Sequence, residues 1–317
     1  MNNIGILTGG DSAEYNISLL SAETVLKYLK NTKYNGIIIH LKNGKYSVGE
    51  QKINTSDFTY IKNNNKITFD KIFIALHGPP AENGLIQSYF DSINLPYTSC
   101  NAIVSALTFN KFACNNMLKK LGFKCANSVI IHVNEKYLKD NIIKKVGLPC
   151  FVKPNGAGSS YGISKITEKN NLIKAIKQAF SYDNKVIIES AINGIEVSCG
   201  VYTDGQKVNA LPITEIVSEN DFFDYEAKYE GKSQEITPAR INKKLTEEIQ
   251  KTTVEIYQKM KLAGICRVDF IIANNQPYII EINTIPGLTE ESIIPKQLQA
   301  ANINLTDFFD ICLNNLN

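Results

Sequence analysis

Apolar residues in the first hundred positions form short runs that predict a sheet of buried strands. The predicted strands are Ile4–Leu7, Gly36–His40 and Lys71–Leu76. Between the first two strands, the apolar positions of Ile17–Leu29 recur with a helical period and predict a helix. This order of elements predicts a parallel βαβ unit and places the chain in the α/β class.

The pattern changes at Cys100, where a second group of elements begins. It predicts a helix near Ala102–Leu121, a strand around Cys150–Lys153, a helix near Asn170–Phe180 and a strand at Lys185–Glu189. The remaining chain predicts a hairpin turning at Asp204-Gly205, a polar stretch at 218–240, an amphipathic helix at 242–262, a hairpin near Asn275 and a terminal helix from Thr306. These groups divide the chain into three predicted domains, 1–99, 100–189 and 190–317.

Composition narrows the class of partner. The 317 residues suffice for two or three domains, and 34 basic against 31 acidic residues leave a net charge of +3. A charge this small predicts neither a nucleic-acid partner nor binding to an anionic membrane. Apolar runs such as residues 72–76 are too short to span a bilayer, and the first residues do not resemble an export signal, so we expect a cytoplasmic protein. A small-molecule partner is favoured.

Cysteine and arginine usage add two expectations. The seven cysteines are scattered without a CxxC pair, which predicts buried thiols rather than disulfides or a zinc site. Arginine occurs only at positions 240 and 267, whereas lysine is abundant. Because arginine alone offers a planar fork of donors, Arg240 and Arg267 are candidate functional residues, although retention by chance is an alternative.

The hairpin within residues 264–287 is the strongest physical signal for chemistry. A turn centred on Asn275 would pair Asp269 with Glu281 and Arg267 with Asn283, all on one face. Apolar residues on the opposite face would form the core; these are Val268, Phe270, Ile280 and Ile282. Two opposed carboxylates repel each other, and a divalent cation would remove that repulsion. The oxygen ligands are those that Mg²⁺ prefers, so we predict a metal site, with a solvated polar face as the alternative.

Two weaker signals lie earlier in the chain. Residues 151–166 place Lys153 before a loop rich in glycine and serine, which could enclose phosphate groups or form an ordinary surface turn. The loop matches neither a P-loop nor a nucleophile elbow. Glu189 and Glu196 stand at the ends of successive predicted strands, where they could accept hydrogen bonds from a ribose or a purine amine, or simply be solvated.

In their order along the chain, these segments resemble the ATP-grasp carboxylate–amine ligases, and their flanking motifs are similar to those of the D-alanine–D-alanine ligase family. The matching segments are LTGGDSAEYNIS (7–18), LHGPPAENGLIQ (76–87), LPYTSCNAIVSALTFNKF (95–112), GLPCFVKPNGAGSSYGISK (147–165), FFDYEAKY (222–229), RVDF (267–270) and EINTIPGLTEES (281–292). The resemblance implies an ATP-grasp architecture: an N-terminal parallel βαβ domain, a small central domain and a C-terminal domain, with ATP between the last two.

The resemblance also implies a role for each matched residue. ATP phosphates would contact Lys111, Lys153 and Lys228. Adenine and ribose would lie against Glu189, Glu196, Phe151 and Phe222. Two Mg²⁺ ions, with Mn²⁺ as a substitute, would be held by Asp269, Glu281 and Asn283. The ammonium group of the first D-alanine would be held by Glu14 with His77, next to Ser159 and Tyr229. An oxyanion would be stabilised by Arg267 and the Gly287 amide, and the carboxylate of the second substrate by Ser292 and the Ile293 amide.

The activity that the resemblance implies is ligation of two D-alanine molecules through a D-alanyl phosphate, for peptidoglycan precursors, by a homodimer. A ligase that takes D-lactate or D-serine second is one alternative, and a catalytically silent nucleotide-binding protein is another. The chain departs from the family pattern at Asn16, in the HGPPAENG turn and at Ser190-Ala191-Ile192.

Overall fold

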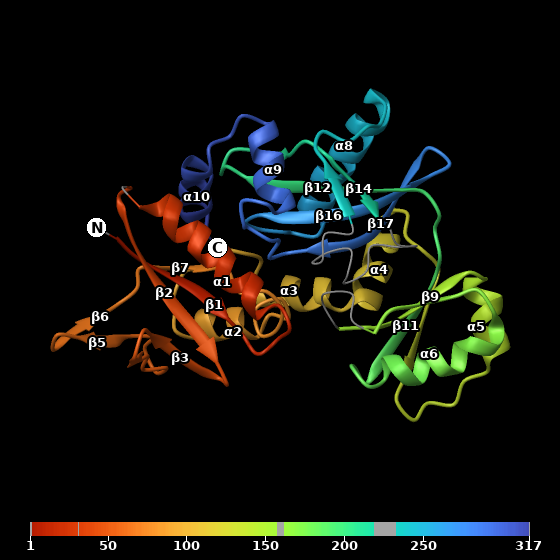
Figure 1. Ribbon diagram of the computed structural model, residues 1–317, viewed down its shortest axis with the longest axis horizontal. Coiled ribbons are helices and arrows are strands. Elements are labelled where there is room, and N and C mark those ends of the chain that lie inside the picture. Colours follow the sequence, from red (N-terminus) through yellow and green to blue (C-terminus); the bar gives the residue numbers. More distant parts are fainter. Residues whose placement is uncertain (1, 31, 157–161, 219–232, 317) are drawn as a thin grey trace.

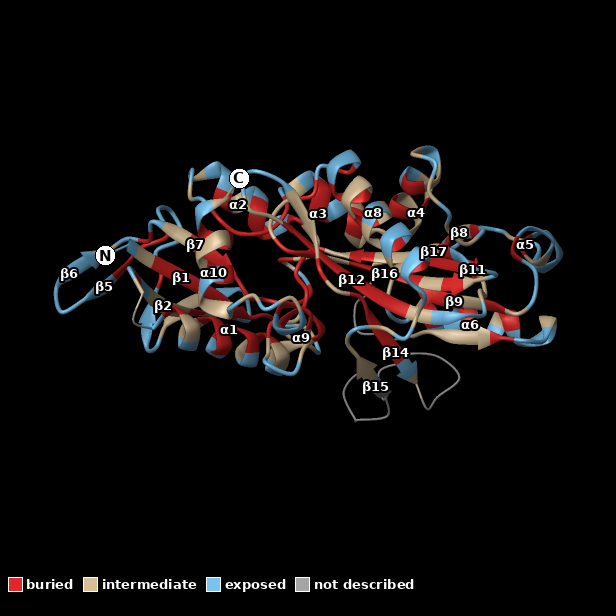
Figure 2. Cartoon of the chain, turned by 90° about the horizontal axis from the view of Figure 1, so that it is seen from above, coloured by how far each residue is buried: buried red, intermediate tan, exposed pale blue. Residues whose placement is uncertain are grey.

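The structure is a computed structural model that describes residues 2–30, 32–156, 162–218 and 233–316. Three large sheets lie in a row, with the N-terminal sheet at one end and the sheet of the C-terminal part in the middle (Figures 1 and 2). They use residues 2–74, 128–190 and 195–283. The fold class is therefore α/β as predicted, and the domain boundaries stay a prediction.

The N-terminal sheet has the strand order β4-β3-β2-β1-β7, and β1 pairs in parallel with both β2 and β7. Its elements are β1 (Asn2–Gly9), α1 (Tyr15–Leu29), β2 (Tyr34–Lys42), β3 (Lys45–Val48), β4 (Gln51–Lys52), β7 (Lys71–Ile74) and α2 (Leu85–Ser92), beside the separate pair β5 (Tyr60–Lys62) and β6 (Asn65–Ile67). The predicted βαβ unit is confirmed. The short polar strands β3 to β6 were not predicted, because they carry little apolar alternation.

An antiparallel sheet of order β10-β9-β11-β8 lies at the other end of the molecule. Its elements are β8 (Ser128–His132), α5 (Lys139–Val146), β9 (Cys150–Pro154), β10 (Ser164–Ile166), the 3-10 helix η1 (Lys169–Asn171), α6 (Leu172–Ala179) and β11 (Lys185–Ser190). The apolar sides of α5 and α6 pack on this sheet through Ile142, Val146 and Ile176.

The third sheet has the order β15-β14-β12-β16-β17, with β13 beside β12. Its elements are β12 (Ile195–Thr203), β13 (Val208–Ala210), β14 (Thr214–Ser218), β15 (Ser233–Ile236), α8 (Lys243–Lys259), β16 (Cys266–Ala273), β17 (Gln276–Asn283), α9 (Ile293–Ala300) and α10 (Leu305–Asn314). The α8 residues Leu245, Ile249 and Ile256 share a core with residues of β12 and β16.

The helix predicted over 102–121 is in fact two helices, α3 (Ala102–Phe109) and α4 (Lys111–Lys120). Asn110 has an extended backbone (φ −81°, ψ 94°), and its side chain accepts a hydrogen bond from the Ala113 amide at 3.0 Å. An asparagine in this role begins a new helix, because its oxygen satisfies an amide that has no partner within the first turn. The break makes Lys111 the first residue of α4.

The hairpin β16–β17 has the predicted pairs Asp269–Glu281 and Arg267–Asn283, but its turn and its register near the turn differ from the prediction. The turn lies at Asn274-Asn275, both with positive φ, and Phe270 pairs with Ile279. A β-bulge between Asp269 and Phe270 then shifts the register by one residue. The prediction that Ile280 enters the core was wrong: Ile279 packs there, and Ile280 lies half-buried in the wall of a cavity.

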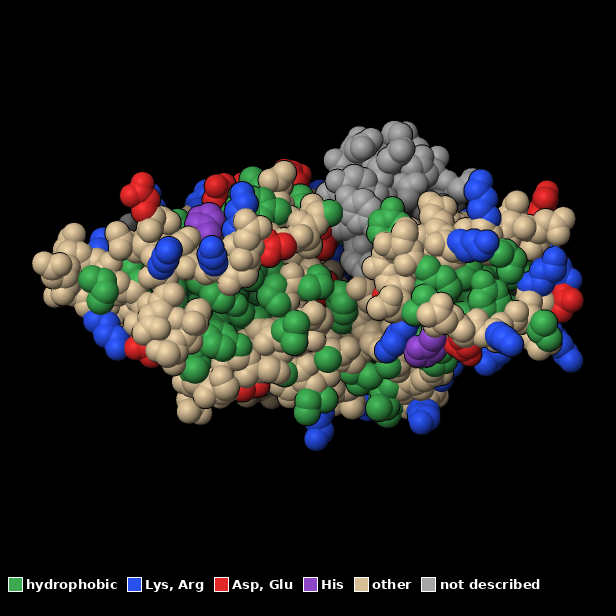
Figure 3. All heavy atoms as spheres, turned by 90° about the horizontal axis from the view of Figure 1, so that it is seen from below, with side chains coloured by type: hydrophobic (Ala, Val, Ile, Leu, Met, Phe, Trp, Pro, Cys, Tyr) green, Lys and Arg blue, Asp and Glu red, His purple; other side chains and the backbone are tan. Residues whose placement is uncertain are grey.

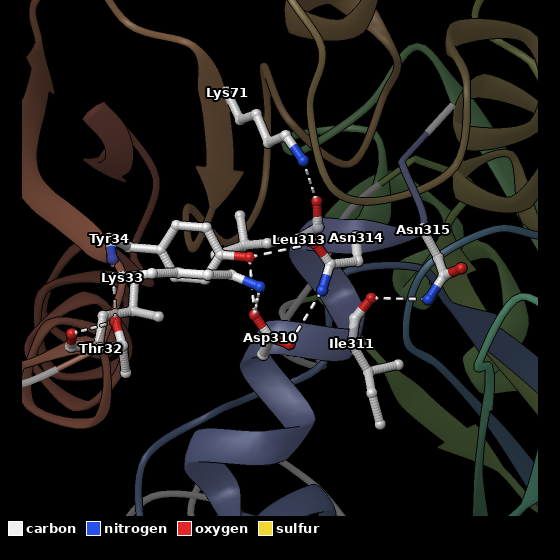
Figure 4. Close-up of polar contacts among 10 residues, drawn as sticks. Thr32, Lys33, Tyr34, Lys71, Asp310, Ile311, Leu313, Asn314 and Asn315 are labelled. Atoms are coloured by element: carbon white, nitrogen blue, oxygen red, sulfur yellow. Dashed lines mark hydrogen bonds and ion pairs between the residues drawn. The ribbon is translucent and has the colours of Figure 1, made fainter. Parts of the chain in front are cut away.

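A shared apolar core joins the two ends of the chain. Phe73 of β7 and residues of α1 pack against Phe308 and Phe309 of α10, and the rings of Phe73 and Phe309 meet edge to face at 5.5 Å. Polar contacts surround this core (Figure 4): the Tyr34 hydroxyl donates to Asp310 at 2.7 Å, and Lys71 Nζ donates to the Leu313 carbonyl at 2.6 Å. The N-terminal sheet is thereby held against the C-terminal helices.

Two expectations drawn from composition can be compared with the structure. All seven cysteines are free thiols, and all except the partly buried Cys125 are buried, as predicted. Lys and Arg side chains, which share one colour, are scattered among acidic ones over the face in Figure 3. Within the described residues, no helix combines the length and hydrophobicity that crossing a membrane requires.

We expect Phe309→Ala to destabilise the protein by about 3–5 kcal/mol, because Phe309 is fully buried between α10, β7 and α1. Ile103→Ala is the control, since Ile103 of α3 is 80% exposed and should change stability by less than about 0.5 kcal/mol. Urea and thermal unfolding would measure both variants. Equal unfolding midpoints would show that the shared core contributes little.

Candidate active site

One cavity of about 430 Å³ is lined by strand residues of the two antiparallel sheets and by residues of α1 and the loops of the N-terminal part. The predicted site residues that line it are Glu14, His77, Lys111, Phe151, Lys153, Glu189, Glu196, Arg267, Asp269, Glu281, Asn283, Gly287, Ser292 and Ile293. The other predicted site residues, Ser159, Phe222, Lys228 and Tyr229, lie outside the described residues. Residues far apart in the sequence therefore meet at one place.

Asp269 and Arg267 form a buried ion pair in the cavity wall. Arg267 donates from Nε to Asp269 Oδ1 at 2.8 Å and from Nη2 to Oδ2 at 2.7 Å, and Ser198 Oγ donates to Oδ1 at 2.5 Å. Burial alone would lower the pKa of Arg267, but Asp269 and Glu281 raise it well above its ordinary value. Arg267 thus already balances part of the carboxylate charge that we expected a cation to balance.

The donor set beside this pair fits a hard divalent cation. Asp269 and Glu281 are direct partners in the β16–β17 ladder, and Asn283 is the next residue of β17 on the same side. Among the residues that the structure describes, Asn283 Oδ1 accepts one hydrogen bond, from the Ile285 amide at 3.0 Å, which leaves the oxygen a second lone pair. Within the described ranges, no three His, Cys, Asp or Glu side chains form a metal-binding group, so the amide oxygen of Asn283 would have to complete the set.

Glu189 lies against Lys153 across neighbouring strands of the four-stranded sheet. The two side chains form an ion pair, each only about one tenth exposed, and Asn115 Nδ2 donates to Glu189 Oε1 at 2.5 Å. Burial opposes the charge of Lys153, but Glu189, Glu281 and Glu196 raise its pKa above the ordinary value. Lys153 is therefore a charged group inside the cavity, available to an anion that can replace Glu189.

Lys111 is placed by the break between α3 and α4. Its backbone N–H donates to the Asn155 carbonyl at 3.2 Å, and the Asn155 side chain bonds Asn110 Oδ1 at 2.9 Å and the Phe112 amide at 2.9 Å. Asn155 directly follows β9, which carries Lys153. Lys111 and Lys153, which both line the cavity, are therefore held close to Asn155.

Glu14 and His77 enter the cavity from the N-terminal sheet. Glu14 precedes the first residue of α1, and its amide donates to Ser12 Oγ at 3.2 Å. His77 is only 4% exposed, and both ring nitrogens have partners in the protein: Ser21 Oγ at 2.9 Å and the Ile285 carbonyl at 3.0 Å. Burial lowers the pKa of His77, although Glu14 acts in the opposite direction.

The loop after β17 carries the remaining predicted residues. Ser292 is the residue that precedes α9, and Ile293 is its first residue, so the positive end of the helix faces the cavity wall. A Cβ on Gly287 would lie 2.8 Å from Ser292 Oγ, so a larger residue at this position would displace the Ser292 hydroxyl. Thr289 Oγ1 lies 2.7 Å from Ser292 Oγ and fixes the hydroxyl beside it.

Several residues of the cavity were not predicted. Glu82 lines it, and burial, then the nearby Glu14, raise the pKa of Glu82 to about 8. Asn115 could have been found from its helical spacing, one turn after Lys111, whereas Ser198 behind Asp269 gave no signal. The second arginine lies elsewhere: Arg240 pairs with Glu215 at 2.8–2.9 Å and is not among the residues lining the cavity.

The chain matches known families over almost its whole length. Residues 3–100 match the model described as D-ala D-ala ligase N-terminus, and residues 117–314 match that of D-ala D-ala ligase C-terminus. It is 52% identical over 314 residues to the D-alanine–D-alanine ligase of Flavobacterium johnsoniae, covering 98% of this chain and 97% of that protein.

Solved structures agree with these matches. D-alanyl-alanine synthetase A from Vibrio cholerae superposes with a TM-score of 0.89 at 27% identity, covering 99% of this chain and 97% of that one. D-alanine–D-alanine ligase from Bacillus anthracis, complexed with ATP, superposes with a TM-score of 0.82 at 25% identity, covering 99% and 97%. Together with the cavity, these matches confirm the ATP-grasp fold, and the chain belongs to the D-alanine–D-alanine ligase family.

Proposed function

We propose that this protein uses ATP to join two D-alanine molecules into D-alanyl-D-alanine, a building block of peptidoglycan precursors. The observation that carries the proposal is the cavity itself, in which the hairpin β16–β17 meets Lys153 of β9 and Glu14 at the start of α1. The hairpin contributes Arg267, Asp269, Glu281 and Asn283. This set combines groups for phosphate, metal, ammonium and oxyanion within reach of one small substrate.

In the first step, a carboxylate oxygen of D-alanine attacks the γ-phosphate of ATP, forming D-alanyl phosphate and releasing ADP, although both reactants are anions. Lys111 and Lys153 would reduce the repulsion by contacting the phosphates, with Lys228 as a third predicted contact. Mg²⁺ held by Asp269, Glu281 and Asn283 would neutralise phosphate charge; we expect two ions, or Mn²⁺ in their place. Phe151, Phe222, Glu189 and Glu196 would hold the adenosine. Glu14 would hold the ammonium group of the substrate, and His77, whose two ring nitrogens bond Ser21 and Ile285, lines the same cavity.

In the second step, the neutral amine of another D-alanine attacks the carbonyl carbon of the D-alanyl phosphate, and the peptide bond forms as the amine loses a proton and inorganic phosphate leaves. Negative charge develops on the carbonyl oxygen, and rigid donors already in place lower the barrier. Arg267 donates two of its N–H groups to Asp269. Its remaining N–H groups can donate to the carbonyl oxygen, together with the Gly287 amide. Ser292 and the Ile293 amide would bind the carboxylate of the second substrate, and Ser159 with Tyr229 would close the site around the first.

The remaining expectations are also proposals. A cytoplasmic location and a homodimer stay predictions. The silent nucleotide-binding alternative is not favoured, because Lys111, Lys153, Arg267 and the oxygen ligands all line the cavity. The choice of D-alanine over D-lactate or D-serine was based on Tyr229, which lies outside the described residues.

Product analysis would test the proposed function. We expect ADP release that depends on D-alanine, and D-alanyl-D-alanine as the main product when D-alanine and D-lactate are supplied equally. Its share should rise with pH, because more of the amine then has no proton. Product masses measured across neutral pH would check this. A predominant depsipeptide would contradict the choice of substrate, and no ADP release at saturating D-alanine would contradict the ligase activity itself.

Replacing Glu281 by Gln should abolish turnover with little loss of stability, since it removes one negative ligand without breaking the Arg267–Asp269 ion pair. Asp269→Asn should also abolish turnover, but it breaks that buried pair and should be less stable. Glu247→Gln on α8, whose side chain is 65% exposed, is the control. Steady-state rates against Mg²⁺ concentration would decide; near-normal rates and Mg²⁺ dependence in Glu281→Gln would exclude this metal site.

Arg267→Lys should lower kcat roughly 10²-fold, because lysine keeps the charge but loses the fork that bonds Asp269 and the oxyanion together. Arg240→Lys offers a matched control, since the Arg240 side chain is 62% exposed and lies outside the cavity wall. Rates of dipeptide formation would be compared. Equal kcat values in the two variants would mean that the Arg267 fork has no part in catalysis.

A further inference from the structure

Ser21 of α1 is a fully buried residue that the mechanism above does not use. It lies about two helical turns after Glu14, which stands at the start of the same helix. Its hydroxyl oxygen is 2.9 Å from His77 Nε2 and accepts a hydrogen bond from the Leu288 amide at 3.3 Å. Ser21 therefore links α1 both to the end of β7 and to the loop after β17.

The directions of these hydrogen bonds can be assigned. The Ile285 carbonyl can only accept, so His77 Nδ1 carries a proton and donates to it. Because burial lowers the pKa of His77, the ring is neutral and Nε2 accepts from the Ser21 hydroxyl. Ser21 then donates once, to His77, and accepts once, from Leu288. Every donor and acceptor in this series of hydrogen bonds thus has a partner within the protein.

This chain of bonds holds the loop on both sides of Gly287. His77 bonds the carbonyl of Ile285, two residues before Gly287, and Ser21 bonds the amide of Leu288, the residue after it. Ile285 and Leu288 are themselves 3% and 2% exposed, so their side chains are buried. The Gly287 peptide is thus held between two hydrogen bonds, one to His77 and one to Ser21, and both of these residues belong to the N-terminal part of the chain.

An oxyanion donor is effective only within a narrow distance range, about 2.7–3.1 Å from the developing charge. The position of the Gly287 amide relative to Glu14 therefore matters, because Glu14 would hold the other end of the same substrate. A single helix, α1, carries Glu14 at its start and the anchor Ser21 further along. Its rigidity sets the spacing between the ammonium acceptor and the oxyanion donor.

We propose that Ser21 is a positioning residue for the reaction, which holds the Gly287 amide in place through His77 and Leu288. The inference rests on the proposed role of Gly287 in binding the oxyanion. Without the hydroxyl, His77 Nε2 and the Leu288 amide both lose a buried partner, and the loop can move away from the carbonyl of the D-alanyl phosphate. Attack by the second amine then slows, and water competes for the intermediate.

Ser21→Ala tests this inference, with Thr24→Val as the matched control. Thr24 lies in the same helix, is also buried, and donates its hydroxyl hydrogen bond only to the Leu20 carbonyl of α1. We expect Ser21→Ala to lower kcat for the dipeptide roughly 10-fold or more, less than the 10²–10³-fold loss of an oxyanion donor itself. KM for ATP should stay unchanged, and the ratio of ADP to dipeptide should rise above that of the wild type.

Amide hydrogen exchange gives a second readout that does not depend on catalysis. The segment 285–288 should exchange faster in Ser21→Ala than in Thr24→Val or the wild type, whereas the rest of α1 should not. An unchanged ADP-to-dipeptide ratio with wild-type exchange at 285–288 would overturn the inference, and so would a fall in kcat that Thr24→Val shows equally. If Ser21→Ala folds poorly, Ser21→Cys keeps the volume with a weaker hydrogen bond and should show the same changes to a smaller extent.

If the wild type forms no dipeptide, the proposed function fails, and the exchange measurement still reports whether Ser21 holds the loop. If the wild type forms one dipeptide per ADP and Ser21→Ala does the same at the same rate, only the role of Ser21 fails. The two failures are therefore distinguishable.

Discussion

The apolar core shared by the first and last parts of the chain is the constraint on which the site depends. Phe73 and α1 pack against Phe308 and Phe309 of α10, which lie more than 230 residues later in the sequence. Burial of this kind is non-directional, so the polar contacts of Tyr34 and Lys71 with α10 fix the relative orientation. Only because of this packing does Glu14, from one end of the chain, share a cavity with Arg267 and Gly287, from the other.

The β16–β17 hairpin contributes the chemistry, and a single irregularity decides its arrangement. A regular ladder continued from the turn at Asn274-Asn275 would set Asp269 opposite Ile280, since Phe270 pairs with Ile279. The bulge moves Glu281 into that place and leaves Ile280 at the cavity wall. Bulges commonly redirect side chains next to active sites, and here one brings two carboxylates together.

How far the sequence predicts this molecule depends on the kind of pattern involved. Periodic apolar runs such as Ile17–Leu29 predicted their elements well, because burial against a core requires that pattern. The break at Asn110 and the bulge beside Asp269 were missed, since each depends on local hydrogen bonds that no periodicity reveals. The pairing of Asp269 with Glu281 was predicted correctly although the turn was not. The predicted turn was centred on Asn275, whereas the observed turn lies between Asn274 and Asn275, and the bulge corrects for this difference.

For the site, the family resemblance identified residues that neither spacing nor composition could. Glu14 and Ser292 are ordinary polar residues of the sequence until long-range packing brings them to one cavity. Other residues support the site from behind, such as Ser198 beside Asp269 and Ser21 beside His77, and these are small hydroxyl residues with no distinctive spacing. Their roles depend on contacts across 71 and 267 residues of chain, which become visible only in three dimensions.

Two cations of the cavity already have a carboxylate of the protein as counter-ion: Lys153 has Glu189, and Arg267 has Asp269. We therefore expect binding of a nucleotide with its metal to exchange these partners rather than to neutralise bare charges. A phosphate on Lys153 would displace Glu189, and a cation on Asp269 would compete with the two N–H groups that Arg267 donates to it. Both pairs would keep these two cations compensated by the protein itself until ligands bind.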